Sequence, residues 1–253
     1  VLLAGLYARG VTSVTEPYLS RDHTERMLKY FGVDLDSEGT KIEIEGYPKL
    51  TGRTIDIPGD FSSAAFFLVA ASILPGSELE ILNVGINPTR TGLLDVLTEM
   101  GASITLENQR LKNEEPVADI KVKSAGLKGT LVGGELIPRL IDEIPVLAVA
   151  AAMADGKTVI RDASELKVKE SDRIESVAQE LGKMGAKIET LPDGMVIHGT
   201  KKLNGAVCQS YGDHRIAMAM CVAGFAARGE TRVTGCECIN ISFPGFMEVF
   251  KAL

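Results

Sequence analysis

Four glycines divide this sequence into similar units, because each one ends a small-residue apolar run and is followed at once by a β-rich segment. The four segments read ARG-VTSV, LPG-SELEIL, ADG-KTVI and ARG-ETRV. Their glycines stand 66, 80 and 73 residues apart. A turn that recurs at such long intervals predicts a series of similar supersecondary units. The glycines are Gly10, Gly76, Gly156 and Gly229.

Amphipathic segments that end in an aromatic or methionine residue plus a glycine follow three of these β-rich segments. Their glycines, Gly32, Gly101 and Gly185, each suit the left-handed C-cap of a helix. Alternating segments such as 41–45 and 186–190 come next and predict strands. The sequence therefore predicts an α/β fold built from repeated β-α-β-α-β-type units of about seventy residues.

Two of the units open with a Gly-Asp pair 17 residues before their turn glycine, whereas the same spacing from Gly10 would fall before Val1. The last unit ends soon after a helix-like segment, 246–250, with no hairpin behind it. We therefore expect a C-terminal fragment, in which residues 1–57 are a remnant unit of an N-terminal domain and residues 58–253 form a C-terminal domain of three units. The two pairs are Gly59-Asp60 and Gly212-Asp213.

Charge and composition exclude several classes of protein. The 253 residues carry 27 Lys and Arg against 34 Asp and Glu, and the net charge of −7 argues against a nucleic acid or an anionic membrane as partner. No apolar run reaches the roughly 18 residues of a membrane span, and the first residues lack the basic leader of a signal peptide. The cysteines form no C-x-x-C pair, which predicts reduced thiols in a cytoplasmic protein and no metal site. They are Cys208, Cys221, Cys236 and Cys238.

The stretch K-V-K-E-S-D-R, residues 167–173, gathers cations and a carboxylate at a predicted helix start. Lys169 and Arg173 are four residues apart and would share one face if the helix began near Glu170, where free backbone N–H groups also favour anions. This pattern predicts a phosphate or carboxylate site, in which Glu170 could exchange a proton once substrate excludes water. A charged, solvated helix start is the alternative.

A second helix start, G-D-H-R at 212–215, has Asp213 as its predicted N-cap and places His214 and Arg215 in the first turn. Arg215 would then face whatever meets that N-terminus. A surface arginine beside a capped helix is the alternative. Arg21 could add another cation at a helix start, or be an ordinary charge in a first turn.

A third candidate is Asp142 in L-I-D-E-I-P, which by its position in the repeat opens a helix just as Asp60 and Asp213 open theirs. Capping is the simple interpretation of all three aspartates. The apolar neighbours of Asp142, however, would desolvate its carboxylate and raise its pKa toward the range of a general base. The sequence leaves both interpretations open.

Taken in order, these motifs resemble the family of 3-phosphoshikimate 1-carboxyvinyltransferases, also called 5-enolpyruvylshikimate-3-phosphate synthases. The order is Asp142, K-V-K-E-S-D-R, G-D-H-R and S-F-P-G-F at 242–246. The stretches E-P-Y-L-S-R-D-H-T-E-R-M-L and G-D-F-S-S-A-A-F-F also look like that family. The resemblance covers the whole chain and implies the enolpyruvyl transferase fold, an inside-out α/β barrel with two domains of three repeats. The four units would then be one remnant unit and one nearly complete domain.

The resemblance also implies a reaction: the enolpyruvyl group of phosphoenolpyruvate passes to the 5-hydroxyl of shikimate-3-phosphate through a tetrahedral intermediate, phosphate leaves, and no metal or organic cofactor is used. It implies that Asp142 is the base facing the 5-hydroxyl and that Glu170 moves the proton at the enolpyruvyl methylene. Cations would hold the two anionic substrates. These would be Arg21 and Lys169 for shikimate-3-phosphate, and Arg173 and Arg215 for phosphoenolpyruvate, with His214 beside them.

Two departures from the family pattern limit what the chain does alone. Ile241 stands where some members have a lysine that touches phosphoenolpyruvate, and the family's N-terminal lysine, serine-glutamine loop and a further arginine would lie upstream of Val1. We therefore expect an inactive fragment of a monomeric parent whose partners are small molecules. The alternatives are a folded, non-catalytic ligand-binding fragment and the related UDP-N-acetylglucosamine enolpyruvyl transferase, which lacks the K-E-S-D-R and G-D-H-R pairing.

Overall fold

The computed structural model describes residues 1–252, and its first unit is a three-stranded antiparallel sheet in the order β1-β3-β2. Apolar and charged residues alternate in β3, so that Ile42 and Ile44 are buried while their neighbours face outward. The elements are α1 (Leu2–Gly5), β1 (Val11–Thr15), α2 (His23–Tyr30), β2 (Leu35–Glu38) and β3 (Lys41–Glu45).

The second unit repeats this pattern, with an antiparallel sheet in the order β4-β6-β5. Its first helix, α3, is apolar on every side and therefore lies inside the protein. Asp60 accepts a hydrogen bond from the backbone N–H of Ser63 and caps that helix, as the sequence predicts. The elements are α3 (Phe61–Ile73), β4 (Glu78–Gly85), α4 (Gly92–Glu99), β5 (Ser103–Lys112) and β6 (Glu115–Lys123).

The third unit has the same strand order, β8-β10-β9, and β7 extends this sheet by pairing parallel with β8. Three short 3-10 helices lie in its connections, at Gly134–Leu136, Ile141–Glu143 and Ser164–Val168. Its regular elements are β7 (Leu131–Val132), α5 (Ile137–Leu140), α6 (Ile144–Met153), β8 (Lys157–Ile160), α7 (Arg173–Lys183), β9 (Lys187–Leu191) and β10 (Gly194–His198).

The fourth unit holds only short parallel strand pairs, β11 with β13 and β12 with β14. The helix predicted near residues 246–250 is present as α9. A 3-10 helix, Cys236–Ile241, precedes it. The regular elements are β11 (Leu203–Asn204), β12 (Val207–Gln209), α8 (His214–Ala226), β13 (Ala227–Arg228), β14 (Arg232–Thr234) and α9 (Phe246–Lys251).

The turn glycines explain why the units repeat. All four that the sequence singles out have φ between 80° and 88°, the left-handed region that side chains with a Cβ rarely adopt. The three C-cap glycines have φ between 89° and 92°. Each of the first three units therefore has two turns from helix to strand at a residue that only glycine suits well, and the fourth unit has one such glycine, Gly229.

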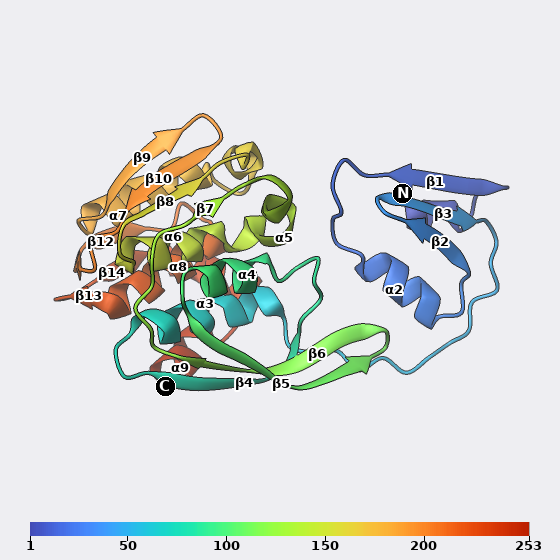
Figure 1. Ribbon diagram of the computed structural model, residues 1–253, viewed down its shortest axis with the longest axis horizontal. Coiled ribbons are helices and arrows are strands. Elements are labelled where there is room, and N and C mark those ends of the chain that lie inside the picture. The colour runs from blue at the N-terminus through green and yellow to red at the C-terminus, as the bar shows by residue number, and fades with distance from the viewer. Residues whose placement is uncertain (253) are drawn as a thin grey trace.

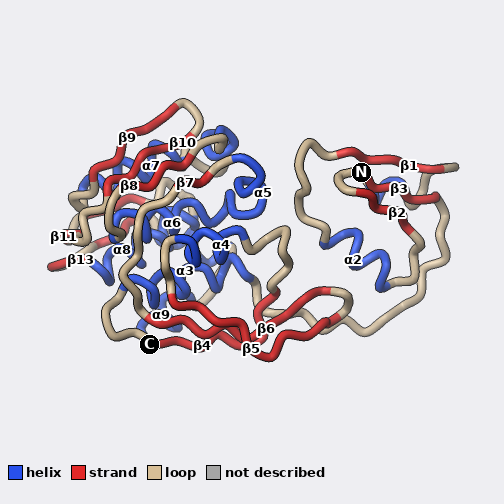
Figure 2. The backbone as a smooth tube through the Cα atoms, viewed as in Figure 1, coloured by secondary structure: helices blue, strands red, loops and turns tan. Residues whose placement is uncertain are grey.

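Three apolar helices, α3, α6 and α8, pack against one another in the centre, and the sheets lie outside them (Figures 1 and 2). This arrangement is the predicted inside-out barrel, with helices within and strands around. It brings the N-terminal ends of α6 and α8 together, since Arg215 in the first turn of α8 contacts Glu143 at the start of α6.

The chain has two separate hydrophobic cores. Leu2, Leu28, Leu35 and their neighbours fill a small one in the first unit, and a large one begins at Phe61. We call residues 1–57 the first lobe and residues 58–252 the second lobe; Figure 1 shows the first lobe, in blue, beside the rest of the chain. Separate cores support the predicted domain boundary at residues 57 and 58, which stays a prediction.

Candidate functional site

The candidate site lies where the loop between β1 and α2 of the first lobe meets the second lobe. That loop carries Arg21, whose guanidinium donates a hydrogen bond to Oδ2 of Asp142, 121 residues further along the chain. Figure 2 shows this loop and α2 facing the second lobe. The contact joins two residues that the sequence offers only as separate candidates.

Asp142 does not cap a helix, so the simpler of its two interpretations is wrong. It lies in the short 3-10 helix before α6, and Glu143 occupies the N-cap position instead. Its pKa also moves opposite to the prediction: burial raises it, but the hydrogen bond from Arg21 and the charges of Arg215 and Lys169 hold it well below its ordinary value. The sequence shows apolar neighbours along the chain but not the cations that folding brings to this carboxylate.

Lys169 and Arg173 do not share a helix face, because α7 begins only at Arg173 with Asp172 as its N-cap. The pair nevertheless converges. Lys169 Nζ lies 3.5 Å from Oδ1 of Asp142, and an Nη of Arg173 lies 3.4 Å from the same oxygen. The predicted cluster of cations is therefore present, although the helical spacing that suggested it is wrong.

The Arg173 side chain is only 2% exposed, which rules out the solvated helix start. It donates from Nε to Oδ2 of Asp213 over 2.8 Å and from an Nη to Glu170 over 2.6 Å. Glu170 itself is about half exposed, at 49%. A carboxylate that is anchored on one side and open on the other is placed to reach a bound molecule.

Asp213 caps α8 as predicted, since it accepts the backbone N–H of Arg215 over 2.8 Å. His214 and Arg215 occupy the first turn. Burial and the neighbouring charge of Arg215 lower the pKa of His214, so the imidazole is neutral at pH 7 and offers hydrogen bonds rather than charge.

Three further residues of the site escaped the sequence interpretation. Glu143, with only 1% of its side chain exposed, accepts hydrogen bonds from Ser62 at 2.5 Å and from Arg215 at 3.4 Å. Arg90 in turn donates to the Ser62 hydroxyl. Ser62 follows the Gly-Asp pair that opens α3, and this repeated signal could have indicated it. Arg90 and Glu143 carry no comparable signal.

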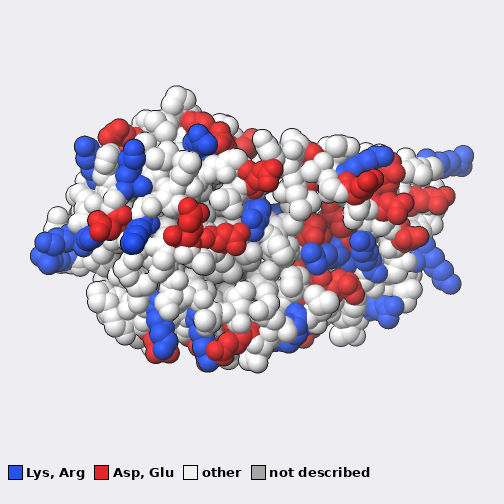
Figure 3. Space-filling model, viewed as in Figure 1, with Lys and Arg blue, Asp and Glu red and all other residues white. Residues whose placement is uncertain are grey.

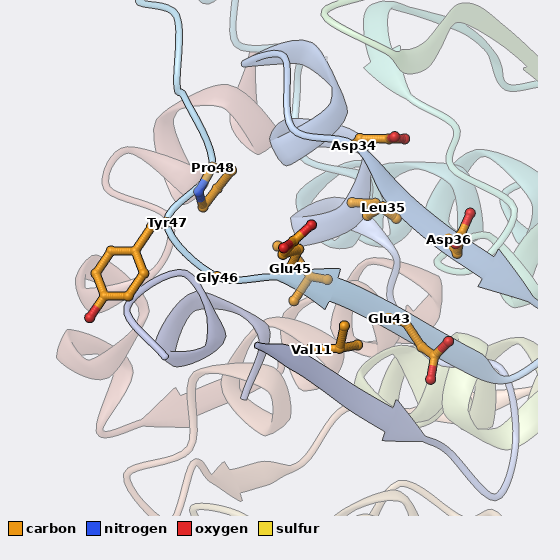
Figure 4. A pocket seen from close by; sticks show the side chains of 10 residues that line it. Val11, Asp34, Leu35, Asp36, Glu43, Glu45, Gly46, Tyr47 and Pro48 are labelled. Atoms are coloured by element: carbon orange, nitrogen blue, oxygen red, sulfur yellow. The ribbon is translucent and has the colours of Figure 1, made fainter. Parts of the chain in front are cut away.

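A cavity of about 440 Å³ lies in the first lobe, lined by other residues than those of the candidate site (Figure 4). Acidic residues from β2, β3 and the turn before β2 line it, including Asp36, Glu43 and Glu45. Carboxylates repel anions, so this cavity is not the predicted phosphate or carboxylate site. Figure 3 shows acidic and basic side chains intermingled over the drawn face, with a basic group beside acidic ones near the junction of the lobes.

Within residues 1–252 the side chains of His, Cys, Asp and Glu form no group of three or more suited to hold a metal ion. All four cysteines are free thiols. None of the helices in this part of the chain has both the length and the apolar character needed to cross a bilayer.

Helices enclosed by sheets, with arginines and carboxylates gathered at the ends of the helices, define the class of enolpyruvyl transferases. Among solved structures, the enolpyruvyl transferase NikO from Streptomyces tendae has the same fold, with a TM-score of 0.78 at 21% identity over 100% of this chain and 57% of that one. EPSP synthase from Acinetobacter baumannii reaches a TM-score of 0.93 at 47% identity, covering 99% of this chain and 58% of its own. The predicted fold class is thus confirmed.

The sequence profile of the EPSP synthase (3-phosphoshikimate 1-carboxyvinyltransferase) family matches residues 1–250, and the chain belongs to this family. Relatives named 3-phosphoshikimate 1-carboxyvinyltransferase include those of Desulforamulus reducens, 61% identical over 99% of this chain, and Pelotomaculum thermopropionicum, 62% identical over 98%. The chain spans 58% of the length of each. Family membership confirms the resemblance seen in the motifs.

Proposed function

We propose that this chain supplies half of the active site of an enzyme that transfers the enolpyruvyl group of phosphoenolpyruvate to the 5-hydroxyl of shikimate-3-phosphate. A C–O bond forms between that hydroxyl and the enolpyruvyl carbon, and inorganic phosphate leaves. The complete enzyme is the full-length form, by which we mean this chain joined to the segment that completes the length of its relatives.

One observation carries the proposal: four cations converge on one carboxylate, Asp142. Arg21, Lys169 and Arg173 contact it directly, and the charge of Arg215 acts on it as well. Both proposed substrates are anions with phosphate and carboxylate groups, which arginine binds in bidentate geometry. An acidic protein that gathers cations at one place is suited to bind such molecules.

Asp142 is the proposed base for the 5-hydroxyl. In this structure the pKa of Asp142 is held well below its ordinary value, because Arg21, Arg215 and Lys169 outweigh the effect of its burial, and such a carboxylate is a weak base. A bound phosphate draws Arg21 and Lys169 toward itself, and burial then raises the pKa of Asp142. The base becomes effective only once its substrate is in place.

Glu170 is the proposed group that transfers the proton at the enolpyruvyl methylene. Its hydrogen bond to Arg173 fixes one carboxylate oxygen, and its half-exposed position leaves the other free. Arg173 and Arg215 hold phosphoenolpyruvate beside it, and His214 neighbours them. Because Arg173 is buried against Asp213, its guanidinium is oriented before any ligand arrives.

The wider setting follows from the same reaction. The partners are the two small-molecule substrates, the full-length form is a monomer in the cytoplasm that binds neither nucleic acid nor membrane, and no cofactor takes part. The chain alone is inactive, since the residues that complete the alignment of two anions lie on the missing segment.

Complementation tests the proposal. This chain and the missing segment, expressed separately, are mixed and assayed for phosphate release from phosphoenolpyruvate with shikimate-3-phosphate as acceptor. We expect turnover from the mixture and none from either part. The same mixture made with Asp142→Ala is the matched control. Turnover with UDP-N-acetylglucosamine in place of shikimate-3-phosphate would show that the proposed acceptor is wrong. Binding of the substrates without turnover would favour a ligand-binding fragment.

A further inference from the structure

The two lobes meet through polar side chains near the start of α2. Apart from the contact of Arg21 with Asp142, the hydrogen bonds from this region of the first lobe to the second lobe involve Asp22, His23 and Arg26. The other hydrogen bonds across the boundary are those of Asp56, next to the junction of the lobes, with Lys112 and Asn113. The hydrophobic cores of the two lobes stay separate. A boundary without a shared apolar core leaves domains free to move relative to each other, so the geometry of Arg21 depends on these few polar contacts.

Asn87 is the centre of this set of contacts. It belongs to the loop between β4 and α4 in the second lobe, yet its amide nitrogen lies 2.6 Å from Oδ1 of Asp22 in the first lobe. The same nitrogen donates to Oε2 of Glu115 over 3.0 Å. The amide oxygen accepts from both the backbone N–H and the hydroxyl of Thr89, at 2.9 and 2.8 Å. At 1% exposure, this side chain has its hydrogen-bonding capacity used.

The charged groups around Asn87 are arranged so that its position requires a hydrogen-bond donor and disfavours a negative charge. Asp22, the first-lobe partner, also forms an ion pair with Arg26 over 2.9 Å. Glu115, on β6, has its Oε1 atom 2.7 Å from Nδ1 of His23. Two carboxylates therefore face the Asn87 amide from opposite lobes. A third carboxylate in its place would repel both.

Asp22 follows Arg21 directly in the chain, and its position limits where the Arg21 backbone can lie. From Asn87 the same loop continues to Arg90, which reaches Ser62 in the candidate site. One short loop thus binds the residue after Arg21 and also carries an arginine that contacts Ser62 in the candidate site. We infer that Asn87 is a positioning residue: it holds the first lobe so that Arg21 reaches the site. This inference rests on the proposed function, in which Arg21 binds substrate.

The test uses this chain and Asn87→Asp, which keeps the shape of the side chain and places a third carboxylate between Asp22 and Glu115. Small-angle X-ray scattering measures the radius of gyration, and the NMR signal of the Arg21 side-chain N–H, assigned with Arg21→Lys, reports its ion pair. We expect N87D at pH 8 to increase the radius of gyration and broaden or shift the Arg21 signal. At pH 5 we expect partial recovery, because crowded carboxylates share a proton.

Two variants distinguish a loss of Arg21 positioning from a general loss of stability. The exchange D22N/N87D restores one amide and one carboxylate across the boundary, although Glu115 still faces position 87. We expect it to move both readouts back toward those of the parent. Asn108→Asp is the matched control, since Asn108 donates to Asp119 over 2.8 Å within the second lobe alone, and we expect it to leave both readouts unchanged. If N87D leaves the radius of gyration and the Arg21 signal unchanged, the inference is wrong. It is also wrong if D22N/N87D restores neither readout. If N87D unfolds the second lobe, the radius of gyration and the Arg21 signal of D22N/N87D decide whether the inference holds.

A second measurement distinguishes this inference from the proposed function. In the full-length form, we expect N87D to weaken shikimate-3-phosphate binding about 10- to 100-fold, as a displaced binding group does, with recovery in D22N/N87D. Separated lobes with unchanged affinity would contradict the substrate role of Arg21 while leaving the positioning of Arg21 by Asn87 intact. Unchanged lobes overturn the inference whatever the affinity.

Discussion

Arg173 at the start of α7 and Asp213 at the start of α8 form a buried ion pair, 2.8 Å from Nε to Oδ2. Asp213 accepts three further hydrogen bonds, from an Nη of Arg173, the Ser171 hydroxyl and the backbone N–H of Arg215. The pair thus fixes the beginnings of two helices and, through them, the neighbouring Glu170 and Arg215. Stability and the geometry of the site depend on the same contact.

The first prediction is that Arg173→Ala destabilises the chain strongly. Removing the guanidinium leaves Asp213 buried and uncompensated, which typically costs about 3–5 kcal/mol in the free energy of unfolding. Urea unfolding of the chain, followed by circular dichroism, measures this loss. Any change in ligand binding by this variant must therefore be interpreted together with its stability.

Arg21→Ala is the matched control for that prediction. Arg21 also pairs with a site carboxylate, but its side chain is far more exposed than that of Arg173. Exposed ion pairs contribute about 0–1 kcal/mol, so this variant should unfold almost like the parent. Equal losses in the two variants would contradict the importance of the buried pair.

The second prediction is that Asp213 contributes to the loss of stability of the chain at low pH. Burial raises the pKa of Asp213, but the hydrogen bond and charge of Arg173 outweigh it and lower the folded-state pKa. The unfolded state then binds more protons, so this stabilisation is present above the ordinary carboxyl pKa of about 4 and is lost as the pH falls through the folded value. Unfolding free energies of the chain and of Asp213→Asn, measured between pH 3 and 7, should show a shallower decline in the variant. Parallel curves would exclude Asp213 as a source of the acid sensitivity.

The third prediction is that residues 1–57 exchange their amide hydrogens faster than the second lobe. Their core holds only a few buried side chains, among them Leu28, Ile42 and Ile44, and it is separate from the larger core. Small separate cores open at lower free energy than large ones. Hydrogen exchange followed by mass spectrometry compares peptides from β1–β3 with peptides from β8–β10. Equal protection would instead indicate one cooperative unit and argue against a boundary at residue 57.

Local signals predict much of this fold. Gly76 and Gly156 are recognisable because a left-handed turn is a requirement of the backbone at a single residue, independent of the rest of the chain. The caps Asp60 and Asp213 are recognisable for the same reason, since each bonds to a backbone N–H within three residues. The order of the units follows once these short-range features are counted.

The electrostatics of the site could not be predicted in the same way. The environment of Asp142 depends on Arg21, which approaches from another lobe, and no pattern along the chain reveals that contact. Glu143 resembles any acidic residue before a proline-containing helix, although folding buries it between Ser62 and Arg215. Charges that meet only in three dimensions set the pKa values, so apolar sequence neighbours predicted the wrong direction for Asp142.

The fourth prediction addresses Glu170 in the full-length form. Glu170→Gln preserves the shape of the side chain but removes the proton-transfer group, so kcat should fall about 10²- to 10⁴-fold with little change in phosphoenolpyruvate affinity. Steady-state kinetics with direct ligand titration measures both quantities. Glu175→Gln removes a charge from the exposed side of α7, the helix that begins three residues after Glu170; it is the matched control and should keep the parent kcat. If Glu170→Gln keeps the parent kcat, Glu170 is not the proton-transfer group.

The last prediction is that shikimate-3-phosphate binding by the full-length form takes up a proton at Asp142. The ligand phosphate competes for Arg21 and Lys169, and it also brings negative charge near a carboxylate that is already buried. Both changes raise the pKa of Asp142 from its depressed value. A site whose pKa rises on binding gains protons, so affinity should decrease as the pH rises.

Calorimetric titrations in two buffers of different ionisation enthalpy count the protons exchanged on binding. The phosphate group of the ligand itself titrates near pH 6 and contributes to that count. Asp142→Asn isolates the protein's share, because the variant keeps the ligand's contribution and lacks the carboxylate. We expect the parent to take up more protons than Asp142→Asn at pH 5 to 6, where a carboxyl pKa raised by burial comes into range. Equal proton counts would mean that Asp142 keeps its cations when the ligand binds, and the base for the 5-hydroxyl would then have to be a different group.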